Sequence, residues 1–324
     1  MFGDSRSGMP VLMFHGLADP VPEYALFSGG RTCLLRHDDF STLIDWCASR
    51  YDLIRLEDLD RVISGEWSGR PPLLLTFDDG LASVVDLATP VLRAHGASAV
   101  VFVTTEWTDT GRTPEIFGLE RRVWEGRPLH LVVTIGGQRF ESHIDSRASA
   151  ERAFSELWKF LFKIRFPPLA LGKEHVLIDG EPWIGQSNVR DRHFWETASW
   201  NELKAAVSEG VLEIGSHMLT HQPLTWLSDG EQLRQLQKSQ EILSDTFGYP
   251  ITACAYPHGF ADRGTESLAR DVYRWSFTTH PGLLDSQTRR SAIPRYHVPG
   301  ENPAQVRRDL KYGRVSRWLA RAGL

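Results

Sequence analysis

The sequence predicts an α/β fold: a distorted, incomplete parallel (β/α) barrel that carries a mixed α+β insertion. Short apolar segments alternate with segments of helical spacing along most of the 324 residues. A helix over 84–94 joins two buried apolar strands, and such a unit favours parallel pairing. Polar residues follow several strands, at the ends where barrel folds carry their chemistry. Fewer than eight complete repeats are present, so we expect an incomplete barrel.

The secondary-structure elements of residues 1–105 are predicted from the spacing of hydrophobic residues and from the glycines at the ends of the segments. Two of them carry the argument for a site. The apolar run Leu73 to Leu75 predicts a buried strand, and Asp78, Asp79 and Gly80 follow it. The complete series comprises a first strand over 11–14, a helix over 40–49, a short strand and helix within 52–63, the strand at 73–75, a helix over 84–94 that ends at Gly96, and a strand over 99–103.

Residues 106–196 are irregular, and we interpret them as an insertion of mixed structure within a single domain of residues 1–324. Alternating apolar residues around Gly136-Gly137 predict a hairpin of strands 129–135 and 138–144. An amphipathic helix over 149–164 ends before Pro167. We expect the insertion to cap or flank the barrel mouth. Its aromatic residues can stack on sugar rings or form the insertion's own core, and we expect the core; they are Trp107, Trp124, Phe140, Trp183 and Trp195.

The elements after the insertion resume the alternation. Ser199 is the expected cap of the first helix, and Gly248 closes the longest one. The basic, amphipathic tail at 305–324 predicts a packing helix. In order, we expect a helix over 201–208, a strand over 212–214, a helix over 229–247, a strand over 252–255, a helix over 265–271, and strands over 275–279 and 293–298.

Two polar motifs at strand ends predict a metal site. Two adjoining aspartates, Asp78 and Asp79, are costly to bury unless a cation or a proton offsets their charge. His217 and His221 follow another strand, four positions apart; on a helical turn they would share one face. With Asp79 or Asp78 as third ligand, two histidines and one carboxylate are typical of catalytic zinc or divalent iron.

These motifs resemble those of a known family. Thr76-Phe77-Asp78-Asp79-Gly80 and Ser216-His217 to His221 match the first two motifs of the polysaccharide deacetylases of the NodB-homology type, carbohydrate esterase family 4. Ala255-Tyr256-Pro257-His258-Gly259 resembles the third. The segments Pro10 to His15 and Ile293-Pro294-Arg295 resemble the poly-N-acetylglucosamine deacetylase-like subgroup. The resemblance covers 10–105 and 197–300 and implies the NodB type of incomplete barrel.

The resemblance implies a role for each matched residue. Asp79, His217 and His221 would hold a divalent metal; we expect zinc, although cobalt, nickel, manganese and iron bind similar sites. Asp78 would be the general base. The backbone amide of His258 would stabilise the oxyanion that forms when water attacks the amide.

The chain departs from the family in two places. Ala255 stands where many relatives have an arginine that orients the base, and Arg295 lies where they have a histidine acid. We expect Arg295 to replace the missing arginine from another strand. The acid is left open among four histidines, for each of which a structural role is the simpler interpretation, or Asp78 returns the proton itself; the four are His297, His280, His258 and His15.

The function expected from these motifs is metal-dependent removal of an acetyl group from an N-acetylated sugar, either a glycan or a glycan precursor. One alternative is hydrolysis of a non-sugar amide such as a cyclic ureide, which a binding site without aromatic platforms would favour. The other is a catalytically silent carbohydrate-binding protein. The missing arginine and acid motivate that alternative, whereas Asp78 beside a full metal triad argues against it.

Composition bears on partners and compartment. The net charge of −5 does not indicate the basic surface that nucleic-acid-binding proteins carry. Three cysteines favour a reducing compartment over a disulfide framework. The segment Met1 to Met9 does not have the pattern of a signal peptide, and no apolar run approaches the length of a membrane span. We therefore expect a cytoplasmic protein that acts on a precursor. The sequence predicts no oligomeric state.

Overall fold

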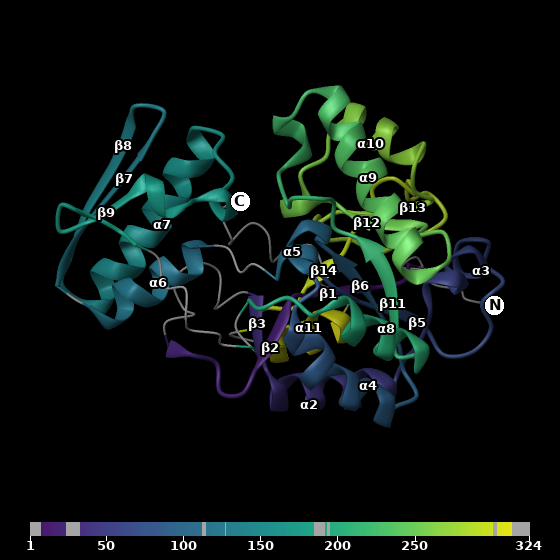
Figure 1. Ribbon diagram of the computed structural model, residues 1–324. Coiled ribbons are helices and arrows are strands. Elements are labelled where there is room, and N and C mark those ends of the chain that lie inside the picture. Colours follow the sequence, from purple (N-terminus) through teal and green to yellow (C-terminus); the bar gives the residue numbers. More distant parts are fainter. Residues whose placement is uncertain are drawn as a thin grey trace.

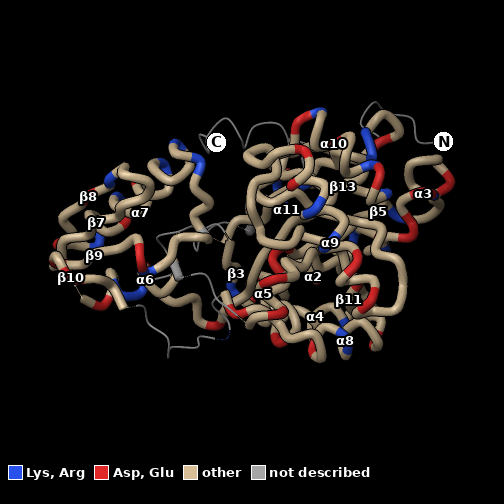
Figure 2. The backbone as a smooth tube through the Cα atoms, turned by 45° about the horizontal axis from the view of Figure 1, so that its top comes forward, with Lys and Arg blue, Asp and Glu red and all other residues tan. Residues whose placement is uncertain are grey.

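The computed structural model describes residues 8–23, 33–111, 115–126, 128–184, 192, 195–300 and 303–312. Figure 1 shows two parts: a curled parallel sheet wrapped by helices, and beside it a smaller lobe built by the middle of the chain. Acidic and basic residues are interspersed along both parts (Figure 2). Among the described residues, no helix combines the length and hydropathy needed to cross a bilayer.

The main sheet forms an incomplete barrel, as predicted. Its strands run in the order β13-β12-β11-β6-β5-β1-β14, with β4 paired beside β5, and the pairs are parallel. The bounds are β1 Val11–Phe14, β4 Asp52–Leu53, β5 Pro72–Phe77, β6 Ala99–Val103, β11 Leu212–Ser216, β12 Ala253–Ala255, β13 Trp275–Phe277 and β14 Tyr296–His297.

Strands β1, β5 and β6 are buried on both faces, which explains their continuous apolar sequences. On β5, Leu73 and Leu75 belong to the large core beneath the outer helices, whereas Leu74 points into a second core inside the curl. Phe102 of β6 and Phe277 of β13 fill the same interior, with ring centroids 5.3 Å apart.

The last strand differs from its prediction and closes the barrel. We predicted one strand over 293–298; only Tyr296–His297 is a strand, and it pairs with β1. Three residues earlier, Ile293 bridges Phe277 of β13 at the opposite edge of the sheet. Pro294 lacks an N–H and interrupts the strand between them. This segment therefore contacts both edges and carries Arg295 across the barrel interior.

The predicted barrel helices are present. One prediction was wrong in kind: residues Val84–Ala88 form a π-helical turn before α4, because Pro90 cannot donate the hydrogen bond that an α-helix needs at this point. The predicted tail helix appears as α11, and residues beyond 312 lie outside the described part. The bounds are α2 His37–Ala48, α3 Leu59–Ile63, α4 Thr89–Ala94, α5 Thr105–Thr110, α8 Trp200–Ser208, α9 Asp229–Phe247, α10 Arg263–Arg270 and α11 Pro303–Tyr312.

The lobe contains the predicted hairpin and helix, together with elements that the sequence did not predict. Its antiparallel sheet has the order β10-β9-β7-β8, and Ile135 pairs with Gln138 across the Gly136-Gly137 turn. The core interpretation is confirmed for four of the aromatic residues: Trp183 and Trp195 are buried in the core, and Trp124 and Phe140 pack against it. Trp107 is also buried but does not belong to this core. The bounds are α6 Glu115–Glu125, β7 Leu129–Ile135, β8 Gln138–Ile144, α7 Arg147–Lys163, β9 Val176–Ile178 and β10 Glu181–Pro182.

A second small sheet was also missed. Strands β2 (Gly16–Ala18) and β3 (Leu34–Arg36) pair in parallel just after β1. They are three residues each, too short for periodicity to reveal. That the chain is one domain with an insertion at 106–196 stays a prediction.

Candidate metal and catalytic site

The chain leaves β5 through a tight turn that contains the paired aspartates, Asp78 and Asp79. Asp79 and Gly80 both have positive φ, 74° and 77°. Glycine adopts this conformation freely and aspartate tolerates it better than most residues. Both carboxylates are nearly inaccessible to solvent, with 2% of Asp78 and 3% of Asp79 exposed. Two buried negative charges side by side require a positive partner each.

His217 and His221 reach Asp79 from a loop, so the prediction that they share a helical turn was wrong. Residues 217–221 contain no helix, and Met218 and His221 have positive φ. Hydrogen bonds hold the loop instead. Gln235 of α9 accepts bonds from the backbone amides of Leu219 and Thr220. These features bend the chain so that both rings point at one carboxylate.

The three ligand groups have the spacing of a metal site. Oδ1 of Asp79 lies 3.5 Å from Nε2 of His217 and 3.2 Å from Nε2 of His221. Ligands held at about 2.0–2.1 Å from one ion at tetrahedral angles lie roughly 3.3 Å apart. The Asp79 oxygen is buried and has no hydrogen-bond partner among the described residues. The residues therefore fit a divalent ion, and a cation would offset the Asp79 charge.

Neighbouring groups prepare the two imidazoles for this role. Nδ1 of His217 lies 2.9 Å from the carbonyl oxygen of Ala255, so its N–H donates there and Nε2 keeps its lone pair. Burial lowers the pKa of His217 to about 4, so the ring is neutral. His221 stacks on Trp107, with centroids 5.0 Å apart. The sequence analysis placed Trp107 in the core and missed this contact with a ligand ring.

Arg295 lies where it was expected, against Asp78. Its guanidinium donates two hydrogen bonds to the carboxylate, of 2.6 and 2.8 Å, and a third to the carbonyl of Thr278. Arg295 is fully buried between the rings of Phe102 and Phe277. Burial alone would raise the pKa of Asp78, but the Arg295 guanidinium outweighs it and holds the pKa below its usual range. Asp78 is thus an oriented, ionised carboxylate beside the metal ligands.

His258 contributes more to the site than its backbone. It occupies the turn Pro257–Gly259 with φ of 57°, and its ring centroid lies 4.8 Å from that of His221. Burial and the nearby His221 and His217 hold the pKa of the His258 imidazole well below its ordinary value. Gly259 is required here, because a Cβ would lie 2.0 Å from Oγ1 of Thr279. The side chain of His258, one of the four candidate proton donors, therefore faces the triad together with its backbone amide.

The other three histidines proposed as acids are not part of the triad, although His15 lies close enough to Asp78 and Asp79 to interact with their charges. His280 is exposed, and its backbone pairs with Thr278 and Arg295. His15 and His297 contact each other instead, with ring centroids 5.4 Å apart.

The lobe meets the site through an aromatic cluster. Phe162, near the end of α7, lies 5.5 Å from the His258 ring, 5.3 Å from Trp226 and 5.9 Å from Phe260, measured between centroids. Phe260 is 38% exposed. The rim cluster of Phe162, Trp226 and Phe260 therefore places apolar rings beside His258, where α7 of the lobe contacts the barrel.

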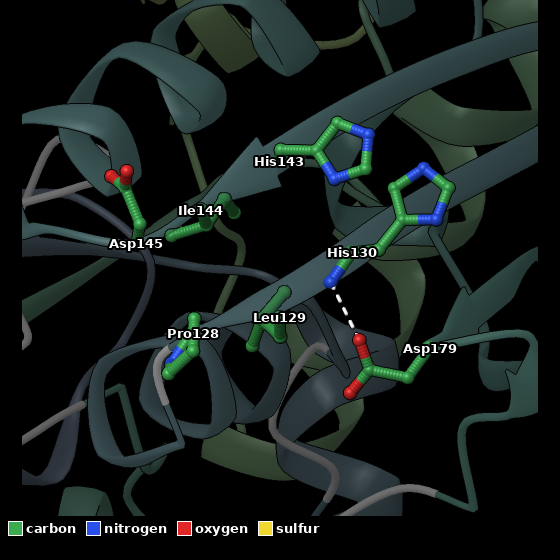
Figure 3. Close-up of a pocket in the computed structure, with 7 residues that line it drawn as sticks. All are labelled: Pro128, Leu129, His130, His143, Ile144, Asp145 and Asp179. Carbon is green, nitrogen blue, oxygen red and sulfur yellow. Dashed lines mark hydrogen bonds between the residues drawn. The ribbon is translucent and has the colours of Figure 1, made fainter.

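A separate hollow of about 350 Å³ lies on the lobe, away from these groups. Figure 3 shows it along β7 and β8, with the His130 and His143 rings side by side and Asp179 accepting a hydrogen bond from the His130 amide. It contains none of the predicted site residues.

Comparisons with known proteins bear on the fold and on the family. A comparison with curated protein sequences found no significant match. Among solved structures, a Streptococcus pyogenes deacetylase, PplD, in complex with acetate has a TM-score of 0.62 at 16% identity, covering 94% of this chain and 98% of its own. IcaB from Ammonifex degensii has a TM-score of 0.57 at 16% identity, covering 93% and 95%. At these identities the likeness shows the fold.

The match of a family profile to the sequence shows the family to which the chain belongs. The profile of polysaccharide deacetylases matches residues 67–126 and 178–273. The matched stretches include Asp78, Asp79, His217, His221 and His258, and the gap between them falls in the lobe. With the shared fold and the buried Asp-His-His triad, this identifies the chain as a member of the polysaccharide deacetylase family.

Proposed function

We propose that this protein is a metal-dependent deacetylase that hydrolyses the N-acetyl group of an N-acetylated sugar. One observation carries the proposal: Asp79, His217 and His221 have ligand spacing around a common point, and the Arg295-oriented carboxylate of Asp78 adjoins them. A binding function needs neither the oriented carboxylate nor the ligand set. Among divalent metals we favour zinc, because two imidazoles and a carboxylate suit it.

A divalent ion at this site supplies Lewis-acid activation of water and of the amide carbonyl. The chain's own groups perform the other steps. Asp78 takes a proton from the attacking water, since its position is fixed by two hydrogen bonds from Arg295. The backbone N–H of His258 donates a hydrogen bond to the oxygen that gains negative charge.

The departing amine needs a proton, and Asp78 can return the one that it took. Arg295 stabilises the ionised form of Asp78, so a protonated Asp78 is a strong acid that gives up its proton readily. This assignment needs no histidine acid. It accounts for a site in which an arginine occupies the place of the family's histidine.

The rim cluster supports a sugar as substrate, because aromatic faces stack on the apolar faces of sugar rings. It weakens the ureide alternative, which called for a site without aromatic platforms. The alternative of a catalytically silent carbohydrate-binding protein is also less well supported, because Arg295 supplies the arginine whose absence motivated it. Three cysteines without a disulfide favour a reducing compartment, so a cytoplasmic precursor stays part of the proposal.

Phe162→Leu tests the rim cluster. We expect a higher KM for N-acetylated oligosaccharides and a nearly unchanged kcat, because the ring contacts His258 and the neighbouring aromatics while leaving the metal ligands untouched. Losing one stacking contact should raise KM by about 10-fold, the effect of roughly 1.4 kcal/mol. Phe154→Leu, buried elsewhere on α7, is the control for general damage to the helix. An unchanged KM for every sugar would exclude Phe162 from the binding site.

The function is tested by acetate release from a substrate panel, with and without added zinc. The panel should contain nucleotide-linked and lipid-linked N-acetylhexosamines, N-acetylglucosamine oligomers and simple ureides. Zinc-dependent acetate release from one sugar class would support the proposal and define the substrate. Turnover of ureides alone would favour the alternative hydrolase. Activity confined to long polymers would contradict the precursor, and no turnover by fully metal-loaded protein would favour the silent binder.

A further inference from the structure

A second cluster of metal-ligating side chains lies at the ends of β1 and β14 and at the start of β3. His15 follows β1, Cys33 precedes β3, and His297 ends β14. Their ligand atoms all lie within 4.8 Å of one another. None of them belongs to the Asp79 triad, and the deacetylation steps proposed above use none of them.

The topology of the chain brings the three residues together. His297 pairs with Met13 in the parallel ladder of β1 and β14. Gly16 pairs with Leu34 in β2 and β3, so the preceding residues, His15 and Cys33, face each other at the end of that ladder. Three segments that are far apart in sequence thus converge at one level. Hydrogen bonding between strands fixes this arrangement, which is therefore a built site.

Two imidazole nitrogens of the cluster are buried without a hydrogen-bond partner among the described residues. Nδ1 of His15 and Nε2 of His297 are both covered from solvent, and neither has a hydrogen-bond partner among the described residues. Leaving such a nitrogen buried and unsatisfied is energetically unfavourable. The rings stand nearly perpendicular, at 83°, rather than stacked. A ligand between the side chains would satisfy both nitrogens.

We propose that His15, Cys33 and His297 form a second metal site that takes a borderline-soft divalent cation of the zinc class. One thiolate and two imidazoles suit zinc or cobalt and disfavour magnesium and calcium, which take oxygen ligands. The sulfur ligand separates this site chemically from the sulfur-free Asp79 triad. Ligation of His15 and His297 would also exclude them as the proton donor in deacetylation.

Cobalt binding tests the proposal directly, because a thiolate bound to Co²⁺ gives a sulfur-to-metal charge-transfer absorption that imidazole and carboxylate ligands do not. The apoprotein is titrated with Co²⁺, and bound metal is measured by mass spectrometry after gel filtration. We expect two equivalents and the charge-transfer band in the wild type. Cys33→Ser should lose the band and one equivalent, whereas His217→Ala should keep the band and lose the other equivalent.

Two further variants serve as a control for removal of a thiol and as a second test of the ligand set. Cys47→Ala removes a cysteine buried in the core and should leave the band unchanged. His297→Gln should weaken cobalt binding at the second site without removing a thiol, which serves if Cys33→Ser fails to fold. One equivalent in the wild type with no charge-transfer band would overturn the second site. Loss of the band in His217→Ala would also overturn it as an independent site, whatever the outcome for deacetylation.

Discussion

Replacing Arg295 by methionine is expected to lower the free energy of unfolding by roughly 3–5 kcal/mol, the usual cost of leaving one member of a buried ion pair unpaired. Arg295 is fully buried and makes two hydrogen bonds to Asp78. Without it, the buried carboxylate loses both hydrogen bonds and the positive charge that offsets its own. Urea unfolding of wild type and variant measures the difference.

A double variant separates loss of the pair from loss of packing. Asp78→Asn removes the stranded charge, so Asp78→Asn/Arg295→Met should be more stable than Arg295→Met alone. Arg93→Met is the matched control: Arg93 pairs with Glu209 at the surface, where such a pair contributes about 0–1 kcal/mol. An Arg295→Met variant no less stable than Arg93→Met would show that the buried pair does not orient Asp78 as described.

His217→Ala is expected to abolish stoichiometric binding of metal at the triad. The imidazole supplies one of three ligands, and its Nε2 is already directed at Asp79 by the hydrogen bond from Nδ1 to Ala255. Loss of an outer partner costs a metal site about 10–100-fold in affinity, and loss of a ligand should cost more. Competition against a chelating dye measures the affinity.

The exposed His280 provides the control for this experiment. His280→Ala should leave the affinity of the triad unchanged, because the hydrogen bonds recorded for His280 involve its backbone. Triad affinity that is equal in His217→Ala and in the wild type would refute the ligand assignment. Asp79 would then require another positive partner for its buried oxygen.

The barrel was predictable because its strands and helices carry local signals. The runs at Val11–Phe14 and Ala99–Val103 are buried on both faces, and continuous apolar sequence marks such strands. The spacing of His217 and His221 indicated their proximity. It did not predict the backbone conformation between them, because residues with positive φ at Met218 and His221 form a loop instead of the helical turn that the spacing favoured.

The features that local sequence patterns could not predict depend on contacts between distant segments. Arg295 reaches Asp78 across 217 positions of sequence, and only the family resemblance suggested that it would. Nothing in the sequence near Phe162 indicates that this residue touches His258. Cys33 and His15 meet through two three-residue strands whose sequences are too short to carry a period. Tertiary pairing, not local propensity, creates these sites.

The central claim is that Asp78 is the base beside a metal held by Asp79, His217 and His221. The most direct measurement is the metal content and the acetate release of one Asp78→Asn sample, compared with wild type and with Asp60→Asn, a surface carboxylate paired with Arg274 and Arg290. We predict full metal content and acetate release reduced by about 10²–10⁴-fold in Asp78→Asn, and wild-type behaviour in Asp60→Asn. Full metal content with undiminished acetate release in Asp78→Asn would contradict the account.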